Sequence, residues 1–270
     1  MCALNGASLG GNILSLCPEC GTELDEHADV CMACGAARVD VESSANGYEL
    51  AVDNLTDQLI AGAFAITSKR GQDEMSGIIT DMSVVNWNTI AIETVLFFHH
   101  MIERYAEGLF GQEVKVQIME KLELPLVGKF AKAGSVSDEN MDNFHKMYVH
   151  NLEQRCAEYN KYQLGNVIDE EIALGADGTF LSDKERTEKF ASIFISEDDI
   201  SEASSGDDEG FKAQLLWQFG RRIAELLGEP DSAKVITYVY RYTIVFLFLT
   251  LNPVKELNSL RNLLGPNDAV

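Results

Sequence analysis

Two Cys-x-x-Cys pairs near the start of the chain are the residues best suited to chemistry. Cys17 and Cys20 form the first pair, Cys31 and Cys34 form the second, and ten residues join them. A Cys-x-x-Cys turn directs both sulfur atoms toward one point, and two such turns side by side complete a tetrahedron of thiolates around a metal ion. Because four sulfurs fill that tetrahedron, no position remains for water or substrate. We therefore do not expect catalysis at this metal.

The segments "CPECG" and "CMACG" carry a family resemblance. They resemble the short zinc-ribbon modules found at the ends of many bacterial and archaeal proteins, over about residues 15–37. The resemblance implies a small β-hairpin with zinc held by Cys17, Cys20, Cys31 and Cys34. Such ribbons accompany membrane anchors, enzymes and adaptors alike, so the resemblance does not identify the function of the whole chain.

The metal in this module has alternatives. Four thiolates can also hold iron, either as a single ion, as in a rubredoxin, or as an iron–sulfur cluster. We expect structural zinc, because cytosolic four-cysteine knuckles of this size more often hold zinc than iron. His27 lies between the two pairs, but a fifth ligand is not needed. Exposed thiolates are oxidisable, so a thiol redox sensor that releases zinc is a further alternative function.

A second group of candidate residues lies in the helical part of the chain. His99 stands four residues before Glu103 and His100 stands three before it, and on a helix each spacing could bridge a metal. The two histidines diverge by about 100° and cannot easily share one ion, so we interpret them as ordinary histidines at a helix edge. The alternative is an enzyme or small-ligand binder in which His99, Glu103, Tyr240 and Arg241 line a pocket between helices.

The elements behind these residues are predicted from apolar spacing. From Tyr48 onward, apolar residues recur every three or four positions, which predicts a mainly α protein. The expected helices cover residues 48–71, 83–108, 112–123 before Pro125, 137–165, a segment capped by Ser182, 209–227, and a short one after Pro253. Cys156 falls on the apolar stripe of the helix at 137–165, where we expect it to pack as a small hydrophobic residue.

Residues 231–251 are apolar nearly all round. As a helix they would be about 30 Å long, enough to span a bilayer. Arg241 stands in the middle, where a lipid-facing charge costs at least about 2.5 kcal/mol, and the uninterrupted apolar run after Thr243 is short. We expect a buried central helix, with a membrane span over residues 235–251 and a pair of strands as the alternatives.

The predicted domain organisation has four parts. These are an N-terminal tail (1–16), a zinc ribbon (17–35), a polar linker (36–47) and an acidic helical domain (48–270). The 46% of hydrophobic residues is ordinary for a packed core. Four of the six cysteines fall within eighteen residues, and no positive charge precedes the first apolar stretch. We therefore expect a cytoplasmic protein without a signal peptide.

The formal net charge of −22 restricts the class of partner. Residues 1–47 carry seven acidic residues and one basic residue, Arg38, and the remainder carries thirty-six acidic and twenty basic residues. Binding to nucleic acid depends largely on Lys and Arg, so we do not expect it. We expect structural zinc and action through protein–protein interaction, either with basic protein surfaces or by self-association.

Overall fold

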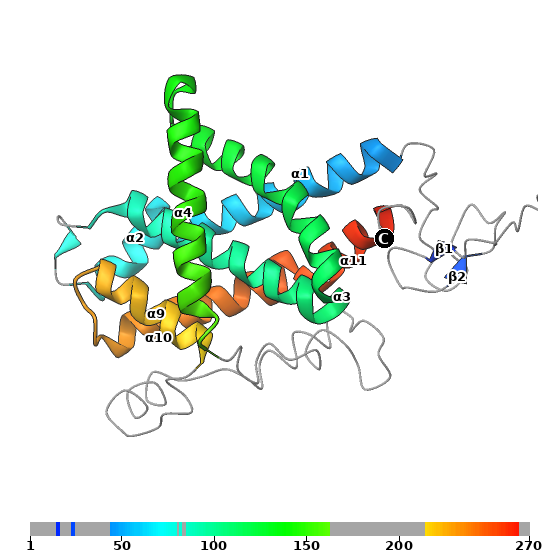
Figure 1. Cartoon of the computed structure of the whole chain (residues 1–270). Coiled ribbons are helices and arrows are strands. Elements are labelled where there is room, and N and C mark those ends of the chain that lie inside the picture. The colour runs from blue at the N-terminus through cyan, green and yellow to red at the C-terminus, as the bar shows by residue number, and fades with distance from the viewer. Residues whose placement is uncertain are drawn as a thin grey trace, which may run out of the picture.

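The computed structural model describes residues 15–16, 23–24, 44–79, 81–82, 85–162 and 214–264, and this part is mainly helical (Figure 1). Two short strands, β1 (Ser15–Leu16) and β2 (Glu23–Leu24), pair antiparallel, with Ser15 opposite Leu24. The four cysteines and the segment capped by Ser182 lie outside the described residues. The zinc-ribbon hairpin therefore stays a prediction at the level of structure.

The helical part begins with α1 (Ser44–Thr67), which starts inside the segment predicted to be a linker. Its inner face includes Leu55 and Leu59, both fully buried. The helix ends earlier than the predicted Gly71, because the Ser68 side chain accepts a hydrogen bond from the Gly71 amide and thereby caps α2 (Lys69–Ser76). A Cβ at Gly71 would collide with the backbone of α1, so the close approach of the two helices requires glycine there.

The longest element, α3 (Trp87–Ala133), has two arms that meet at a kink at Gly111. Gly111 has φ 80° and ψ 176°, a conformation essentially restricted to glycine. Lys115 Nζ lies 3.1 Å from Glu103 Oε1, although twelve residues of straight helix would separate them by about 18 Å. The second arm therefore turns back beside the first. The predicted break between residues 108 and 112 is confirmed.

The prediction that the second arm ends before Pro125 is wrong. Proline removes a backbone donor from the helix, yet the helix continues to Ala133. Leu122 and Leu126 are fully buried on the two sides of Pro125, and Phe130 is nearly so. Burial of this apolar stripe offsets the hydrogen bond lost at Pro125. This burial depends on tertiary packing, which the sequence around Pro125 does not show.

A 3₁₀ turn, η2 (Asp138–Asn140), leads into α4 (Met141–Tyr159), which crosses the first arm of α3 (Figure 1). Tyr148 and Tyr159 are buried against α3, as the predicted stripe requires. The helix ends at Tyr159 rather than at the predicted Gly165. Arg104 donates to the carbonyl of Tyr162 and thereby ties the segment after α4 to the first arm of α3.

The C-terminal part consists of α9 (Leu215–Leu226), α10 (Ala233–Val245), a π-helical segment η3 (Phe246–Leu251) and α11 (Pro253–Leu263). The prediction of a helix over much of 231–251 is confirmed, and the alternative of two strands is wrong. One face of α10 is buried, including Ile236 and Tyr240. Within the described ranges, no helix is both long enough and apolar enough to cross a bilayer.

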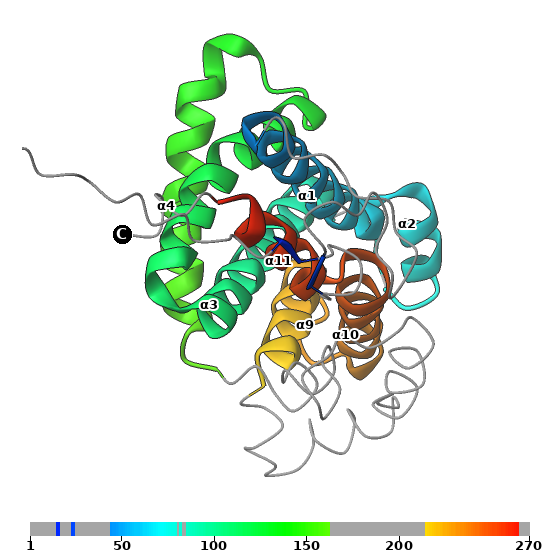
Figure 2. The same ribbon diagram turned by 90° about the vertical axis from the view of Figure 1, so that its right-hand side faces the viewer.

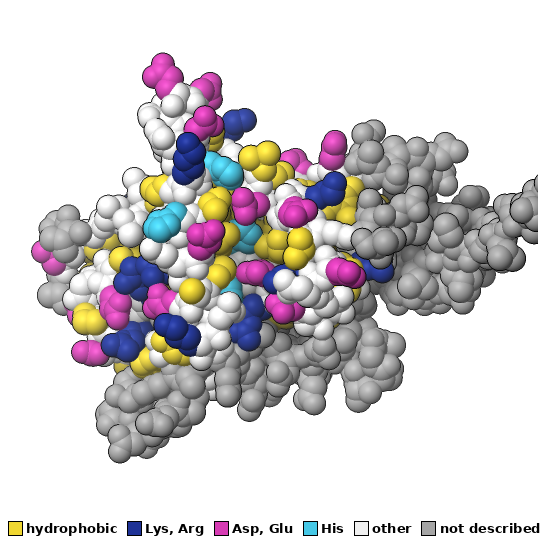
Figure 3. Space-filling view, viewed as in Figure 1, with side chains coloured by type: hydrophobic (Ala, Val, Ile, Leu, Met, Phe, Trp, Pro, Cys, Tyr) yellow, Lys and Arg dark blue, Asp and Glu magenta, His cyan; other side chains and the backbone are white. Residues whose placement is uncertain are grey.

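The core joins these helices through aromatic side chains. Phe97 stacks on Phe219 with ring centroids 3.9 Å apart and meets the edge of Tyr159 at 5.5 Å, while Phe98 stacks on Phe246 at 4.5 Å. The C-terminal helix α11 packs beside both α1 and α3 (Figure 2). On the face shown in Figure 3, acidic and basic side chains are interspersed with apolar ones.

Candidate functional site

A cluster of polar side chains lies where the first arm of α3 meets α4. His99 and His100 are both buried on α3, although the sequence interpretation placed them at a helix edge. Their neighbours come from α4 and from the second arm of α3, which the kink at Gly111 brings back beside the first. The tertiary fold, rather than local spacing, therefore assembles this cluster.

His99 is a hydrogen-bonded core histidine. Its Nδ1 shares a hydrogen bond of 3.1 Å with the Tyr148 hydroxyl, and the two rings stack. Burial lowers the pKa of His99 to about 4, since desolvation disfavours the charged imidazolium, so the ring is neutral at pH 7. Burial also raises the pKa of Tyr148. Both groups are thus neutral and engaged with each other.

Glu103 is the most heavily contacted carboxylate of the cluster. Its Oε1 accepts from Lys115 Nζ at 3.1 Å, and its Oε2 accepts from Cys156 Sγ at 3.5 Å. The neighbouring His100 ring is the largest cause that lowers the pKa of Glu103 to about 2, followed by Lys115 and Cys156. Lys115 also bonds Glu107 at 3.3 Å, so the ammonium is shared between two carboxylates.

His100 and Cys156 complete the group around Glu103 Oε2. The His100 Nδ1 lies 3.8 Å from this oxygen, which is too long for a hydrogen bond. The His100 ring is fully buried, and neither of its nitrogens has a hydrogen-bond partner in the described part of the chain. An unsatisfied buried polar group costs about 1–3 kcal/mol, so this imidazole is an anomaly in the core.

Cys156 does not pack as a purely apolar residue, as its position on the stripe suggested, because its thiol contacts the Glu103 carboxylate. Burial, and then the negative charge of Glu103, raise the pKa of this thiol to about 12. One donor atom each of His100, Glu103 and Cys156 lie within 4.8 Å of one another, close enough to ligate one metal ion. The sequence shows the His100 and Glu103 spacing, but Cys156 is fifty-three residues farther along and carries no local signal.

A second polar group, centred on Glu93, joins three helices and was not singled out from the sequence. Glu93 on α3 is 4% exposed, accepts from the Tyr159 hydroxyl at 2.7 Å and pairs with Arg155 Nε at 2.8 Å. Arg222 Nε of α9 lies 3.6 Å from its other oxygen. Burial, with the nearby Glu93 charge, raises the pKa of Tyr159 far above its usual value. Glu93 and Tyr159 are buried while the two arginines are partly exposed, and the group connects α3, α4 and α9.

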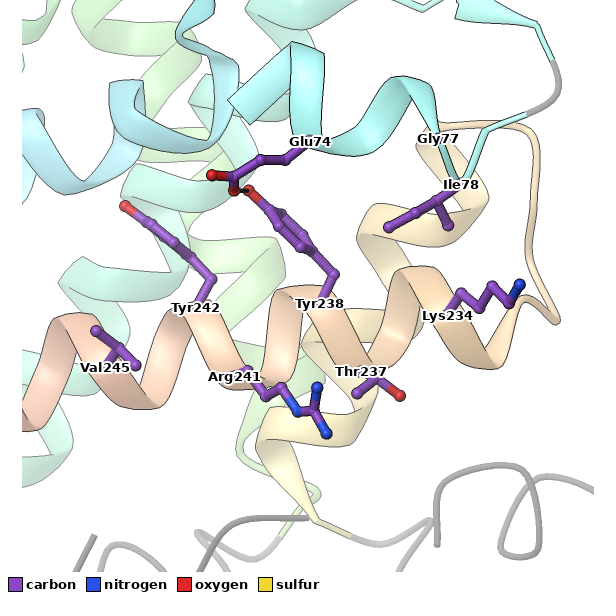
Figure 4. A pocket seen from close by; sticks show the side chains of 9 residues that line it. All are labelled: Glu74, Gly77, Ile78, Lys234, Thr237, Tyr238, Arg241, Tyr242 and Val245. Atoms are coloured by element: carbon purple, nitrogen blue, oxygen red, sulfur yellow. Dashed lines mark hydrogen bonds between the residues drawn. The ribbon is translucent and has the colours of Figure 1, made fainter. Parts of the chain in front are cut away.

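The remaining two predicted residues lie on α10, away from the cluster around Glu103. Tyr240 is buried, and burial raises its pKa. Arg241 lines a surface groove of about 440 Å³ between α2 and α10, in which the Tyr238 hydroxyl donates to Glu74 at 2.9 Å (Figure 4). His99, Glu103 and Tyr240 do not line this groove. The structure therefore does not bring the four predicted residues together in this pocket.

Comparison with known proteins finds one family. Residues 16–38 match the family model of the zinc-ribbon domain. This segment contains Cys17, Cys20, Cys31 and Cys34. No curated protein and no solved structure matches the chain. The match supports zinc binding by this segment, and residues 16–38 are thus identified as a zinc-ribbon domain.

Proposed function

We propose that this chain is an interaction protein in which a zinc ribbon with structural zinc is joined to an acidic helical body. The observation that carries the proposal is the zinc-ribbon match at residues 16–38. Cys17, Cys20, Cys31 and Cys34 supply four thiolates, a complete set for a closed site. A ribbon of this size buries too little apolar area to fold alone, so zinc supplies its folding free energy, about 10–16 kcal/mol in comparable peptides.

The charge of the ribbon region supports contact with a basic protein surface. The first 47 residues carry seven acidic residues against one basic residue, whereas both signs are interspersed on the face of the helical body in Figure 3. A surface of one sign steers encounter with a partner of the opposite sign and rejects partners of the same sign. A site of four thiolates suits a cytoplasmic location, where thiols are kept reduced.

The proposal is tested by chemical crosslinking of the full chain in native lysate, followed by mass spectrometry. The chain with zinc should crosslink through the ribbon to basic proteins, and this crosslinking should weaken as salt is raised. A variant with serine at the four ribbon cysteines should lose these partners, while Cys156→Ser should keep them. Recovery of the same partners without the ribbon cysteines, or of no ribbon partner at all, contradicts the proposal.

An enzyme or small-ligand binder is the second candidate, supported by the groove between α2 and α10. Lys234 and Arg241 line the groove and suit a small anionic molecule, while the Glu74 carboxylate in the same groove accepts the hydrogen bond of the Tyr238 hydroxyl. Thermal denaturation with a panel of carboxylate and phosphate metabolites tests this function. A rise in melting temperature that Arg241→Gln abolishes would support it, and no rise with any anion would count against it. A thiol redox sensor would differ from a protein with purely structural zinc in one measurement. Low peroxide should release zinc from the ribbon and at the same time abolish binding of a partner.

A further inference from the structure

We propose a second metal site in the helical body, where His100, Glu103 and Cys156 bind one Zn²⁺ ion. We call these three residues the donor cluster. This site is separate from the zinc ribbon, because its ligands come from α3 and α4.

The distances within the donor cluster fit a tetrahedral zinc ion. With Zn–N and Zn–O distances of about 2.0 Å and a Zn–S distance of about 2.3 Å, tetrahedral donor atoms lie about 3.3–3.6 Å apart. Glu103 Oε2 lies 3.5 Å from Cys156 Sγ and 3.8 Å from His100 Nδ1. All three donor atoms lie within 4.8 Å of one another. Small side-chain movements are sufficient to place them around one ion.

The unpaired His100 ring is the independent observation that points to a ligand. Both ring nitrogens are buried and have no hydrogen-bond partner among the described residues, although native proteins pair nearly all such groups. His99, one residue away, differs from His100 in that its Nδ1 shares a hydrogen bond with the Tyr148 hydroxyl. A zinc ion held by Glu103 Oε2 would give one nitrogen of this ring the partner that it lacks.

The charges around the donor cluster also suit zinc. Lys115 contacts Glu103 through Oε1, which leaves Oε2 facing His100 and Cys156. Binding of Zn²⁺ displaces the thiol proton of Cys156 to solvent, and the resulting thiolate together with the Glu103 carboxylate neutralises the two charges of the ion. Nitrogen, sulfur and oxygen donors together are ligands that zinc accepts.

The donor cluster supplies three protein ligands and so leaves one coordination position open. This number of ligands is typical of zinc ions that bind water or substrate, whereas the ribbon supplies four. The ligand expected at the open position is a water molecule or a small anion. The two predicted sites thus differ in their number of exchangeable positions, and this difference can be measured by spectroscopy.

The experiment titrates Co²⁺ into the full chain carrying serine at the four ribbon cysteines, with absorption spectra recorded in the near ultraviolet and visible. One equivalent should saturate a thiolate-to-cobalt charge-transfer band together with the visible bands of a four-coordinate ion. Azide should shift the visible bands by occupying the open position. Absence of a saturable band, while circular dichroism shows an intact helical body, overturns the site. Bands that azide leaves unchanged overturn the open position.

Variants in the same background identify the ligands. Cys156→Ser should abolish the charge-transfer band, and His100→Gln and Glu103→Gln should each weaken cobalt binding about 10-fold or more. Cys2→Ser and His150→Gln are the matched controls, because they remove another thiol and an exposed imidazole on α4. A band retained in Cys156→Ser, or lost in either control, assigns the metal to other residues. Helicity measured for each variant separates lost binding from lost folding.

Discussion

Replacement of Glu93 by alanine tests whether the buried polar group between α3, α4 and α9 stabilises the helical body. The Glu93 side chain is 5% exposed and pairs with Arg155, which is 22% exposed. Truncation leaves the Tyr159 hydroxyl without its acceptor and removes the buried partner of Arg155. Breaking a fully buried ion pair costs about 3–5 kcal/mol, and the partial exposure of Arg155 reduces this to about 2–4 kcal/mol.

Glu158→Ala is the matched control, because Glu158 also bonds Arg155, at 2.7 Å, but is 44% exposed. Exposed ion pairs contribute about 0–1 kcal/mol, so its loss should be small. Urea denaturation followed by circular dichroism measures the free energy of unfolding of both variants and the parent. In thermal melts, Glu93→Ala should lower the midpoint by roughly 5–12 °C. Equal, small effects of the two variants would refute the assignment of Glu93 as a stabilising buried group.

Three further predictions concern packing, pH and metal. Gly62→Ala places a methyl group against the Phe246 ring and should lower the free energy of unfolding, measured by urea denaturation, by about 1–3 kcal/mol. Gly128→Ala is the control, because its methyl group meets open space and should not destabilise the protein. Similar losses of stability in both variants would contradict the packing at Gly62. The pKa of His99 is about 4 in the folded protein, against 6.5 for an ordinary histidine as in the unfolded chain. Between pH 4 and pH 6.5 the unfolded chain therefore binds more protons than the folded protein. Stability should therefore fall by about 2 kcal/mol from pH 7 to pH 5, and a fall that persists in His99→Gln would assign it to another group. A chelator should expose the amides of residues 17–35 to hydrogen exchange and leave the helical body protected; ribbon protection that survives verified zinc removal would disprove structural zinc.

The helical character of the chain could be predicted from sequence because apolar periodicity reports which face of a helix is buried. The break at Gly111 was also predictable. The apolar spacing is regular up to residue 108 and again from residue 112, and it is interrupted between them. Two boundaries were not predictable. The helix continues through Pro125 because Leu122 and Leu126 are buried on both sides, and α1 ends at Thr67 because Ser68 caps the next helix. Both outcomes depend on contacts or caps that override local preference.

The candidate sites divide in the same way. The cysteine spacing by itself determined the zinc-ribbon assignment, because all four ligands and their turns lie within eighteen residues. The fold-back of α3 and the crossing of α4 decided the rest, since they place Lys115 and Cys156 beside Glu103. His100 and Glu103 are neighbours on one helix and visible in the sequence. Their burial, and the thiol that faces them, depend on tertiary packing between segments fifty-three residues apart, which no local pattern encodes.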